Sequence, residues 1–157
     1  MKLRGIVALV LTVAIGLLTR CSGRSASYDT LTAAEVVEPI QQAADFSEMQ
    51  QGDAEKLRKI YHIEAGDVAD FILYTAVSNV KADELAVIKV KDSSDTERVV
   101  NQIQQRIEAQ TVKFQDYRPE QYYLIEKHVL KSKGPFVFFA VSKDADRMER
   151  AFDEVLR

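Results

Sequence analysis

The chain has 157 residues but only one cysteine, Cys21, and only two histidines, His62 and His128. A single cysteine cannot form an internal disulfide, so the fold depends on packing, for which a 46% apolar composition suffices. The two histidines are far apart in sequence, and neither stands in an H-E-x-x-H or similar metal-binding spacing. We therefore interpret both as structural residues.

Motifs of several enzyme classes are also missing. The chain has no glycine-rich phosphate loop and no G-x-S-x-G nucleophile turn. Asp144 and Asp146 stand like the first ligands of a calcium loop, but Met148 and Glu149 occupy the positions of the next acidic ligand and the required glycine. We expect these aspartates to cap a helix N-terminus. The sequence thus marks no catalytic, cofactor-binding or metal-ligating residue, and we expect no cofactor.

Acidic side chains outnumber basic ones outside the first twenty residues. The chain has 24 acidic and 21 basic side chains, but Lys2, Arg4 and Arg20 stand in a leading segment that holds no acid. The remainder therefore carries a net charge of −6. Phosphate backbones require a concentrated basic surface, so we expect an acidic soluble domain with no nucleic-acid partner.

The leading segment has the pattern of a secretory signal peptide. Lys2 and Arg4 precede an uncharged apolar run over residues 6–18, and Arg20 prevents its extension. A spanning helix needs roughly 20 apolar residues, and this run of 13 is shorter. The pattern predicts a signal peptide over residues 1–20 rather than a permanent membrane helix.

Cys21 follows the apolar run in a polar stretch, where a core cysteine is not expected. The arrangement resembles a bacterial lipoprotein signal, in which the cysteine is acylated and becomes the mature N-terminus. It departs from such signals at Arg20, where they carry a small residue. Ordinary secretion is the alternative, because the small residues 25–27 fit a cleavage site that would leave Tyr28 first. We predict lipid attachment at Cys21.

Helical periodicity and capping residues predict four helices. Thr32 and Glu35 form a capping box, after which Pro39 either kinks the helix or begins it. Ser94 and Glu97 form a second box, at the start of the clearest apolar stripe in the chain. The predicted helices cover residues 30–46, residues 53–61 with Asp53 as N-cap, residues 92–117 and residues 144–156.

Four segments rich in β-branched and aromatic residues predict strands, over residues 70–76, 84–91, 122–132 and 136–142. The last two flank a short turn and read as a hairpin. Without alternation of strands and helices, the order ααββαββα predicts an α+β fold: a mostly antiparallel four-stranded sheet with helices on one face. Residues 21–29 are expected to be a flexible tether, and residues 30–157 a single domain.

The last predicted strand is apolar on both faces, since Phe136 and Phe138 alternate with Val137 and Phe139. It is expected either to be covered on both sides or to present one face to a partner, which would allow a homodimer.

Several lysines gather in and around the predicted strands, notably Lys89, Lys91, Lys127 and Lys131. If they share one face of the sheet, they are candidates to bind an anionic ligand such as a cell-wall polymer or lipid headgroup. The alternative is that their stems cover apolar surface or that they protect an edge strand from aggregation.

Three segments, residues 82–92, 114–130 and 134–146, resemble the bacterial extracytoplasmic lipoproteins grouped as domain of unknown function 4358. The resemblance runs from about Tyr61 to the C-terminus, and it implies one domain outside the cytoplasm. The family offers no catalytic or binding residue to carry over.

Leader, composition and resemblance together predict a lipid-anchored protein on the outer face of the cell membrane, a binding or assembly module for an unknown envelope protein or polymer. One alternative is a secreted hydrolase that uses carboxylates or a metal. The other is a structural, homodimeric interaction domain.

Overall fold

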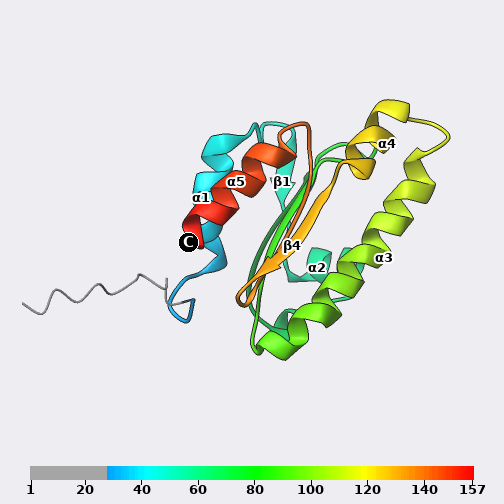
Figure 1. Ribbon diagram of the computed structural model, residues 1–157. Helices are drawn as coiled ribbons and strands as arrows, with labels where there is room; N and C mark the ends of the chain where they lie inside the picture. The colour runs from blue at the N-terminus through cyan, green and yellow to red at the C-terminus, as the bar shows by residue number, and fades with distance from the viewer. Residues whose placement is uncertain (1–27) are drawn as a thin grey trace, which may run out of the picture.

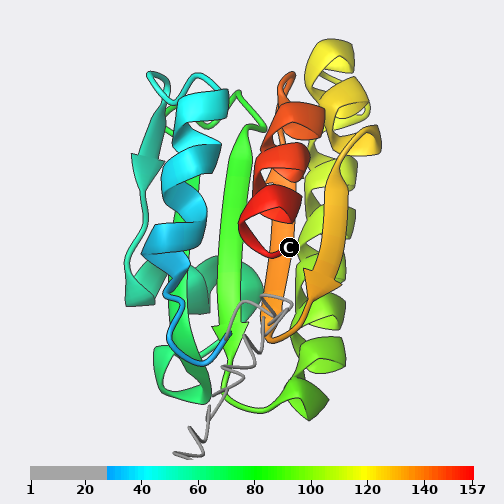
Figure 2. The same ribbon diagram turned by 60° about the vertical axis from the view of Figure 1, so that its left-hand side comes forward.

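The computed structural model describes residues 28–157, which form a five-stranded sheet with helices on both faces (Figure 1, Figure 2). The helices are α1 (Ala33–Ala43), α2 (Ala54–Tyr61), α3 (Thr96–Phe114), α4 (Pro119–Glu126) and α5 (Ala145–Val155). The strands are β1 (Met49–Gln51), β2 (Val68–Ala76), β3 (Glu84–Val90), β4 (Val129–Lys133) and β5 (Phe136–Val141).

The strands lie in the order β1-β2-β3-β5-β4, and all neighbours are antiparallel. The predicted α+β class and antiparallel sheet are therefore confirmed, although the sheet has a fifth strand and helices cover both of its faces. The additional strand, β1, consists of Met-Gln-Gln and is too short and too polar to show strand alternation in the sequence.

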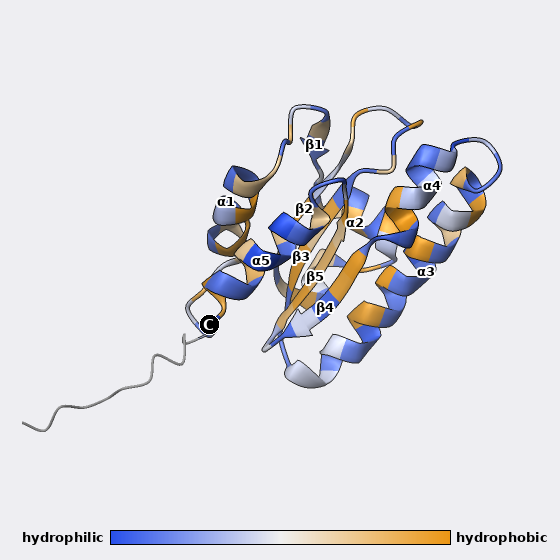
Figure 3. Ribbon diagram, turned by 45° about the horizontal axis from the view of Figure 1, so that its top comes forward, coloured by the Kyte–Doolittle hydropathy of each residue, from blue (hydrophilic) through white to orange (hydrophobic). Residues whose placement is uncertain are grey.

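Each face of the sheet contributes to its own apolar core. On one face, Ala86, Ile88 and Val90 of β3 pack with residues of α2, α3 and α4. On the other, Leu85 and Val87 pack with residues of α1 and α5. Figure 3 shows apolar residues running through the central strands, while the helices alternate between polar and apolar residues. Every residue of β5 is buried, which confirms that this strand is covered on both sides.

Two of the predicted helix starts are confirmed. The backbone N–H of Thr32 donates to Glu35 Oε2 at 2.8 Å, and the Thr32 hydroxyl accepts from the Glu35 N–H. Asp53 Oδ1 accepts from the Lys56 N–H at 2.9 Å. Pro39 lies inside α1, so it does not begin the helix.

One predicted cap is wrong, and another is confirmed in position but not in its hydrogen bond. The carboxylate of Asp92 accepts the N–H of Ser94 at 2.9 Å, and α3 begins only at Thr96, so Ser94 does not cap it. Asp144 occupies the N-cap position of α5, but its carboxylate makes no capping bond and lies 3.5 Å from Arg147. In both places another polar side chain competes for the predicted capping group. Asp92 accepts the Ser94 N–H, and Arg147 donates to the Asp144 carboxylate.

Helix α4 stands where the sequence predicted the start of the third strand. Pro119 is in the first turn of α4, where a backbone N–H would have no partner within the helix, so the missing N–H of proline costs nothing. This proline therefore follows α3 and also begins α4. The aromatic and β-branched composition of residues 122–126 had favoured a strand. Glu126 and His128 therefore do not share a strand, because Glu126 ends α4 and His128 Nδ1 lies 2.7 Å from the Ile125 carbonyl oxygen.

None of the helices within residues 28–157 has the length and apolar character that a membrane span requires. The predicted signal peptide over residues 1–20 and the predicted lipid-attachment residue Cys21 lie outside the described residues.

Candidate functional site

Buried polar side chains gather at one end of the sheet, which we call the polar end. In the described part of the chain, the buried polar residues are Thr75, Glu84, Gln110, Gln121 and Ser142. Thr75 pairs with Glu84 across β2 and β3, and Glu84 pairs with Val141 at the end of β5. Gln121 Oε1 accepts the N–H of Ala82 at 2.8 Å, just before β3. The remaining buried residues of the described chain are apolar.

The polar end contains a buried ionic cluster of Tyr61, Glu84 and Arg106. The Tyr61 hydroxyl donates to Glu84 Oε1 at 2.5 Å. Arg106 donates to Glu84 through Nη2 at 2.8 Å and through Nε at 3.2 Å, a bidentate arrangement that fixes the guanidinium plane. Glu84 is only 2% exposed, so the carboxylate depends on these two partners.

Local structure explains why these three side chains meet. Glu84 begins β3 and shares the strand face of Ala86 and Ile88, which α2 and α3 cover. Arg106 lies one residue before the buried Ile107 on the covering helix α3. Tyr61 ends α2 and is fully buried on the same side.

The environment sets the ionisation of two members of the cluster. Burial, together with the charge of Glu84, raises the pKa of Tyr61 well above its usual value. Burial alone would lower the pKa of Arg106, but the hydrogen bonds and charge of Glu84 outweigh it and raise that pKa. Around neutral pH, Tyr61 is therefore a neutral donor and Arg106 a cation.

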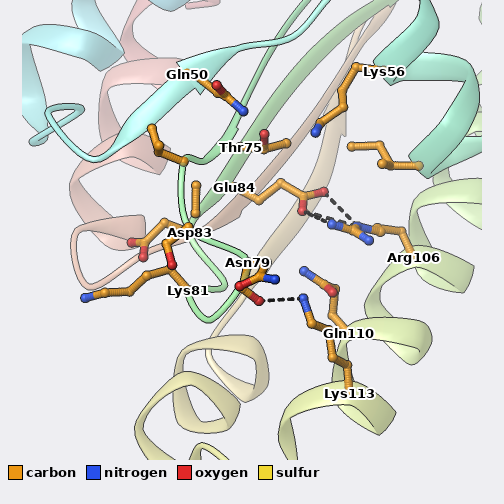
Figure 4. Close-up of a pocket in the computed structure, with 14 residues that line it drawn as sticks. Gln50, Lys56, Thr75, Asn79, Lys81, Asp83, Glu84, Arg106, Gln110 and Lys113 are labelled. Carbon is orange, nitrogen blue, oxygen red and sulfur yellow. Dashed lines mark hydrogen bonds and ion pairs between the residues drawn. The ribbon is translucent and has the colours of Figure 1, made fainter.

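A pocket of about 210 Å³ opens beside this cluster (Figure 4). Its polar lining includes Lys56, Thr75, Arg106, Gln110 and Lys113. Figure 4 shows the Glu84–Arg106 pair between Thr75 and Lys56 on one side and Gln110 and Lys113 on the other. Lys113 Nζ donates to the Asn79 carbonyl at 2.8 Å and so ties α3 to the connection between β2 and β3.

Several polar groups that line the pocket have no partner in the described chain. Thr75 and Gln110 are each only 6% exposed, yet neither the Thr75 hydroxyl nor the Gln110 side-chain amide makes a hydrogen bond to a described residue. The same holds for Lys56 Nζ and for Arg106 Nη1, since Arg106 uses only Nε and Nη2 on Glu84. Native proteins rarely leave a buried polar group unsatisfied, so the buried Thr75 hydroxyl, together with the unpartnered donors around it, makes this pocket the candidate site.

Two carboxyl groups line the pocket, and they differ in environment. Glu84 is held by Tyr61 and Arg106. In Figure 4, Asp83 lies beside Lys81 and points away from the Glu84–Arg106 pair. Partial burial raises the pKa of Asp83.

The four lysines proposed from the sequence lie elsewhere and do not converge. Lys89 and Lys131 are both on the α1/α5 face, where Lys89 donates to the carbonyls of residues 29 and 31 at 3.0 and 2.8 Å. Lys131 pairs with Glu149 and Asp153 at 2.8 and 2.9 Å, and these hydrogen bonds raise its pKa. Lys91 donates to the Gly66 carbonyl, and Lys127 is exposed at the end of α4, with Nζ 5.9 Å from the centre of the Tyr123 ring.

No sequence motif marks the residues that do converge: Tyr61, Thr75, Glu84, Arg106 and Gln110. The sequence signal that could have located them is a polar or charged residue at a position where the helix or strand repeat places apolar residues. Arg106 falls within the apolar stripe of α3, and Glu84 within that of β3. In the described residues, no three histidine, aspartate or glutamate side chains gather as potential metal ligands.

The family model described as domain of unknown function (DUF4358) matches residues 42–142. The chain belongs to this family. No curated protein and no solved structure matches it. The DUF4358 match contains all five strands, helices α2 to α4 and every residue of the pocket, but it excludes α5 and nearly all of α1. The polar end therefore lies within the family domain.

Proposed function

We propose that this DUF4358 protein is a binding module of the cell envelope whose ligand occupies the pocket at the polar end. The observation that carries the proposal is the buried hydroxyl of Thr75 in the pocket wall, which has no hydrogen-bond partner in the described chain and lies beside the unpartnered side-chain amide of Gln110. An unsatisfied buried polar group costs about 1–3 kcal/mol. If a ligand forms the missing hydrogen bond with this group, the cost of the unsatisfied group is offset, which explains why the fold retains the group.

The geometry favours binding over the alternative of a carboxylate-dependent hydrolase. Such an enzyme needs two carboxyl groups that face one reacting bond and are free to exchange protons. Here Glu84 is fixed by Arg106 and Tyr61, and Asp83 points away from them. The pocket is therefore suited to holding a ligand rather than cleaving one.

The geometry also gives little support to the alternative of a homodimer formed through the last strand. That proposal requires one apolar face of β5 to remain open. Helices of the same chain cover both of its faces, and Phe138 stacks on Phe152 of α5 with ring centres 4.8 Å apart.

The proposed location rests on the leader and on where the domain begins. Tyr28, the first described residue, packs against Phe136 at the start of β5, with ring centres 6.5 Å apart, and its hydroxyl donates to the Leu156 carbonyl at 3.3 Å. The pocket is at the opposite end of β5, next to Val141. An acylated Cys21 would therefore attach the domain by the end remote from the pocket and leave the pocket facing away from the membrane.

The intact mass of the protein from its native membrane fraction tests this location. We expect a mature chain that begins at Cys21 and carries a diacylglyceryl group, and a Cys21→Ser variant that lacks the lipid and leaves the membrane fraction. An unmodified chain beginning at Tyr28, or one retaining Met1, would contradict anchoring.

The binding role predicts an unusual effect of Thr75→Val on stability. This change removes the hydroxyl but keeps the side chain's shape, so the free energy of unfolding should stay the same or rise by about 1 kcal/mol. Thr96→Val is the matched control, because Thr96 Oγ1 is also buried and unpartnered but does not line the pocket. Urea unfolding measures both. A clear loss of stability in Thr75→Val alone would mean that the hydroxyl supports the fold, and the pocket would lose its main evidence.

A further inference from the structure

We propose that the pocket binds an oxyanion, a carboxylate or phosphate group of a small organic ligand. This inference rests on the proposed binding function and adds the chemical class of the ligand. It concerns the pocket beside the Glu84–Arg106 pair rather than the lysines on the α1/α5 face.

The charged residues around the pocket favour an anionic ligand. The pocket is lined by four basic residues, Lys56, Lys81, Arg106 and Lys113, but by only two acidic ones, although acidic residues outnumber basic ones in the whole chain. The charge of Glu84 is already neutralised by Arg106. Lys81 lies 3.5 Å from Glu48, so Lys56 and Lys113 are opposed by Asp83 alone, and a net positive charge remains near the cavity. An anion is the ligand that this excess attracts.

The unpartnered polar groups of the pocket are all able to donate hydrogen bonds. Arg106 Nη1 and Lys56 Nζ can only donate hydrogen bonds, and the Thr75 hydroxyl and the Gln110 amide can also donate. Four donors from α2, β2 and α3 therefore surround one cavity. Oxyanions accept several hydrogen bonds at once, and bonds from charged donors are the stronger ones.

The Arg106 guanidinium is held in place before a ligand binds. Glu84 holds the Arg106 guanidinium through Nε and Nη2, and Tyr61 fixes Glu84 in turn. The guanidinium therefore presents Nη1 in a fixed direction before any ligand arrives, which reduces the entropy that binding would otherwise lose.

The size and lining of the pocket indicate an organic ligand rather than a free inorganic ion. A volume of about 210 Å³ exceeds that of several water molecules, at about 30 Å³ each in the liquid. Ile60 and Val77 also line the pocket, and Val77 is 63% exposed. They offer apolar contact to the part of the ligand that carries the oxyanion.

Calorimetric titration of the full-length chain in a non-ionic detergent tests the proposal, with inorganic phosphate and acetate as separate probes at low salt. We expect saturable binding of one probe per chain, and whichever of the two binds more tightly distinguishes phosphate from carboxylate recognition. Lys56→Met should weaken that binding about tenfold, the value of one charge-assisted hydrogen bond. Thr75→Val should also weaken it while the protein remains as stable as the wild type.

Lys59→Met is the matched control, because Lys59 is exposed on the same helix and does not line the pocket. Its affinity should stay within about twofold of the wild type, since screened surface charges contribute little. If neither probe binds, or if Lys56→Met and Lys59→Met weaken binding equally, the oxyanion assignment is wrong. The proposed binding function fails separately, through a loss of stability in Thr75→Val.

Discussion

Tyr61, Glu84 and Arg106 form a cluster that folding alone does not require. Moving a carboxylate and a guanidinium out of water costs several kcal/mol per ion, and apolar residues of similar volume often stabilise a core equally well or better. Here the cluster also fixes a donor at the pocket wall. We infer that the cluster is retained for the site rather than for stability.

Replacing one member of this cluster should be far more harmful than replacing all three. Glu84→Gln removes the counter-charge of Arg106, whose side chain is 21% exposed, and should lower the free energy of unfolding by about 3 kcal/mol. Combining Tyr61→Phe, Glu84→Met and Arg106→Met removes both charges and the unpaired hydroxyl together, so stability should return to within about 1 kcal/mol of the wild type. Urea unfolding compares the three proteins. A triple variant as unstable as Glu84→Gln would show that the cluster holds the fold.

The individual site residues could be only partly anticipated from the sequence. Arg106 beside Ile107 and Glu84 in phase with Ala86 are visible as charged residues on apolar faces. Their pairing was not visible, because 22 positions separate them and only the packing of α3 on this face of β3 brings them together. The lysines were visible as a group, but the two carboxylate partners of Lys131 on α5 were not.

The turn between β1 and α2 controls how α2 and Lys56 sit against the sheet. A Cβ atom added at Gly52 would lie 2.4 Å from Leu73 Cδ1 and 2.9 Å from Lys56 Cγ. Leu73 is fully buried, so it has little room to move. The close approach of this turn to β2 therefore requires glycine.

Gly52→Ala should accordingly lower the free energy of unfolding by about 1–3 kcal/mol through overpacking. Gly66→Ala is the matched control, because a Cβ atom there would meet nothing within 4 Å, and its stability should equal or slightly exceed that of the wild type. Thermal unfolding of the two variants measures the difference. Equal stability of both would contradict the tight packing of this turn.

Sequence periodicity predicted the longer elements well, because each spans enough residues to show its repeat. The capping box of Thr32 and Glu35, the N-cap Asp53 and the fully buried β5 are all confirmed. The elements that were missed or assigned to the wrong type are short. Three residues of β1 show no repeat, and in α4 the strand-like composition of residues 122–126 competed with a helix start at Pro119.

The two ends of the sheet differ in character. The buried polar residues of the described chain gather at the polar end, and the large apolar side chains that are most exposed lie in the connections and helices around the same end. These are Val77 and Val80 between β2 and β3, Val112 near the end of α3, Tyr117 before α4, and Tyr123 on α4. Single exposed apolar residues are ordinary, but their concentration at one end matches a surface that meets ligands or partners.

Opposite the polar end of the sheet is the end at which the described chain begins, which we call the entry end. Tyr28 and the β4–β5 hairpin lie at the entry end, where a Cβ atom added at Gly134 would come within 2.7 Å of the Tyr28 ring. The family match covers the whole sheet and the pocket but excludes α5 and most of α1, the layer against which Tyr28 packs. The polar end thus lies within the part of the chain that the family model describes, as does the β4–β5 hairpin at the other end of the sheet.

The most direct test of this account is a titration of the isotopically labelled full-length chain followed by two-dimensional ¹H–¹⁵N NMR, with inorganic phosphate and acetate added separately. The account predicts that the side-chain amide of Gln110 and the backbone amides of Lys56 and Thr75 shift saturably with at least one anion. The amides of Lys89 and Lys131 should stay in place. Shifts confined to these two lysines, or no saturable shift at the polar end, would contradict the claim that this pocket is the binding site.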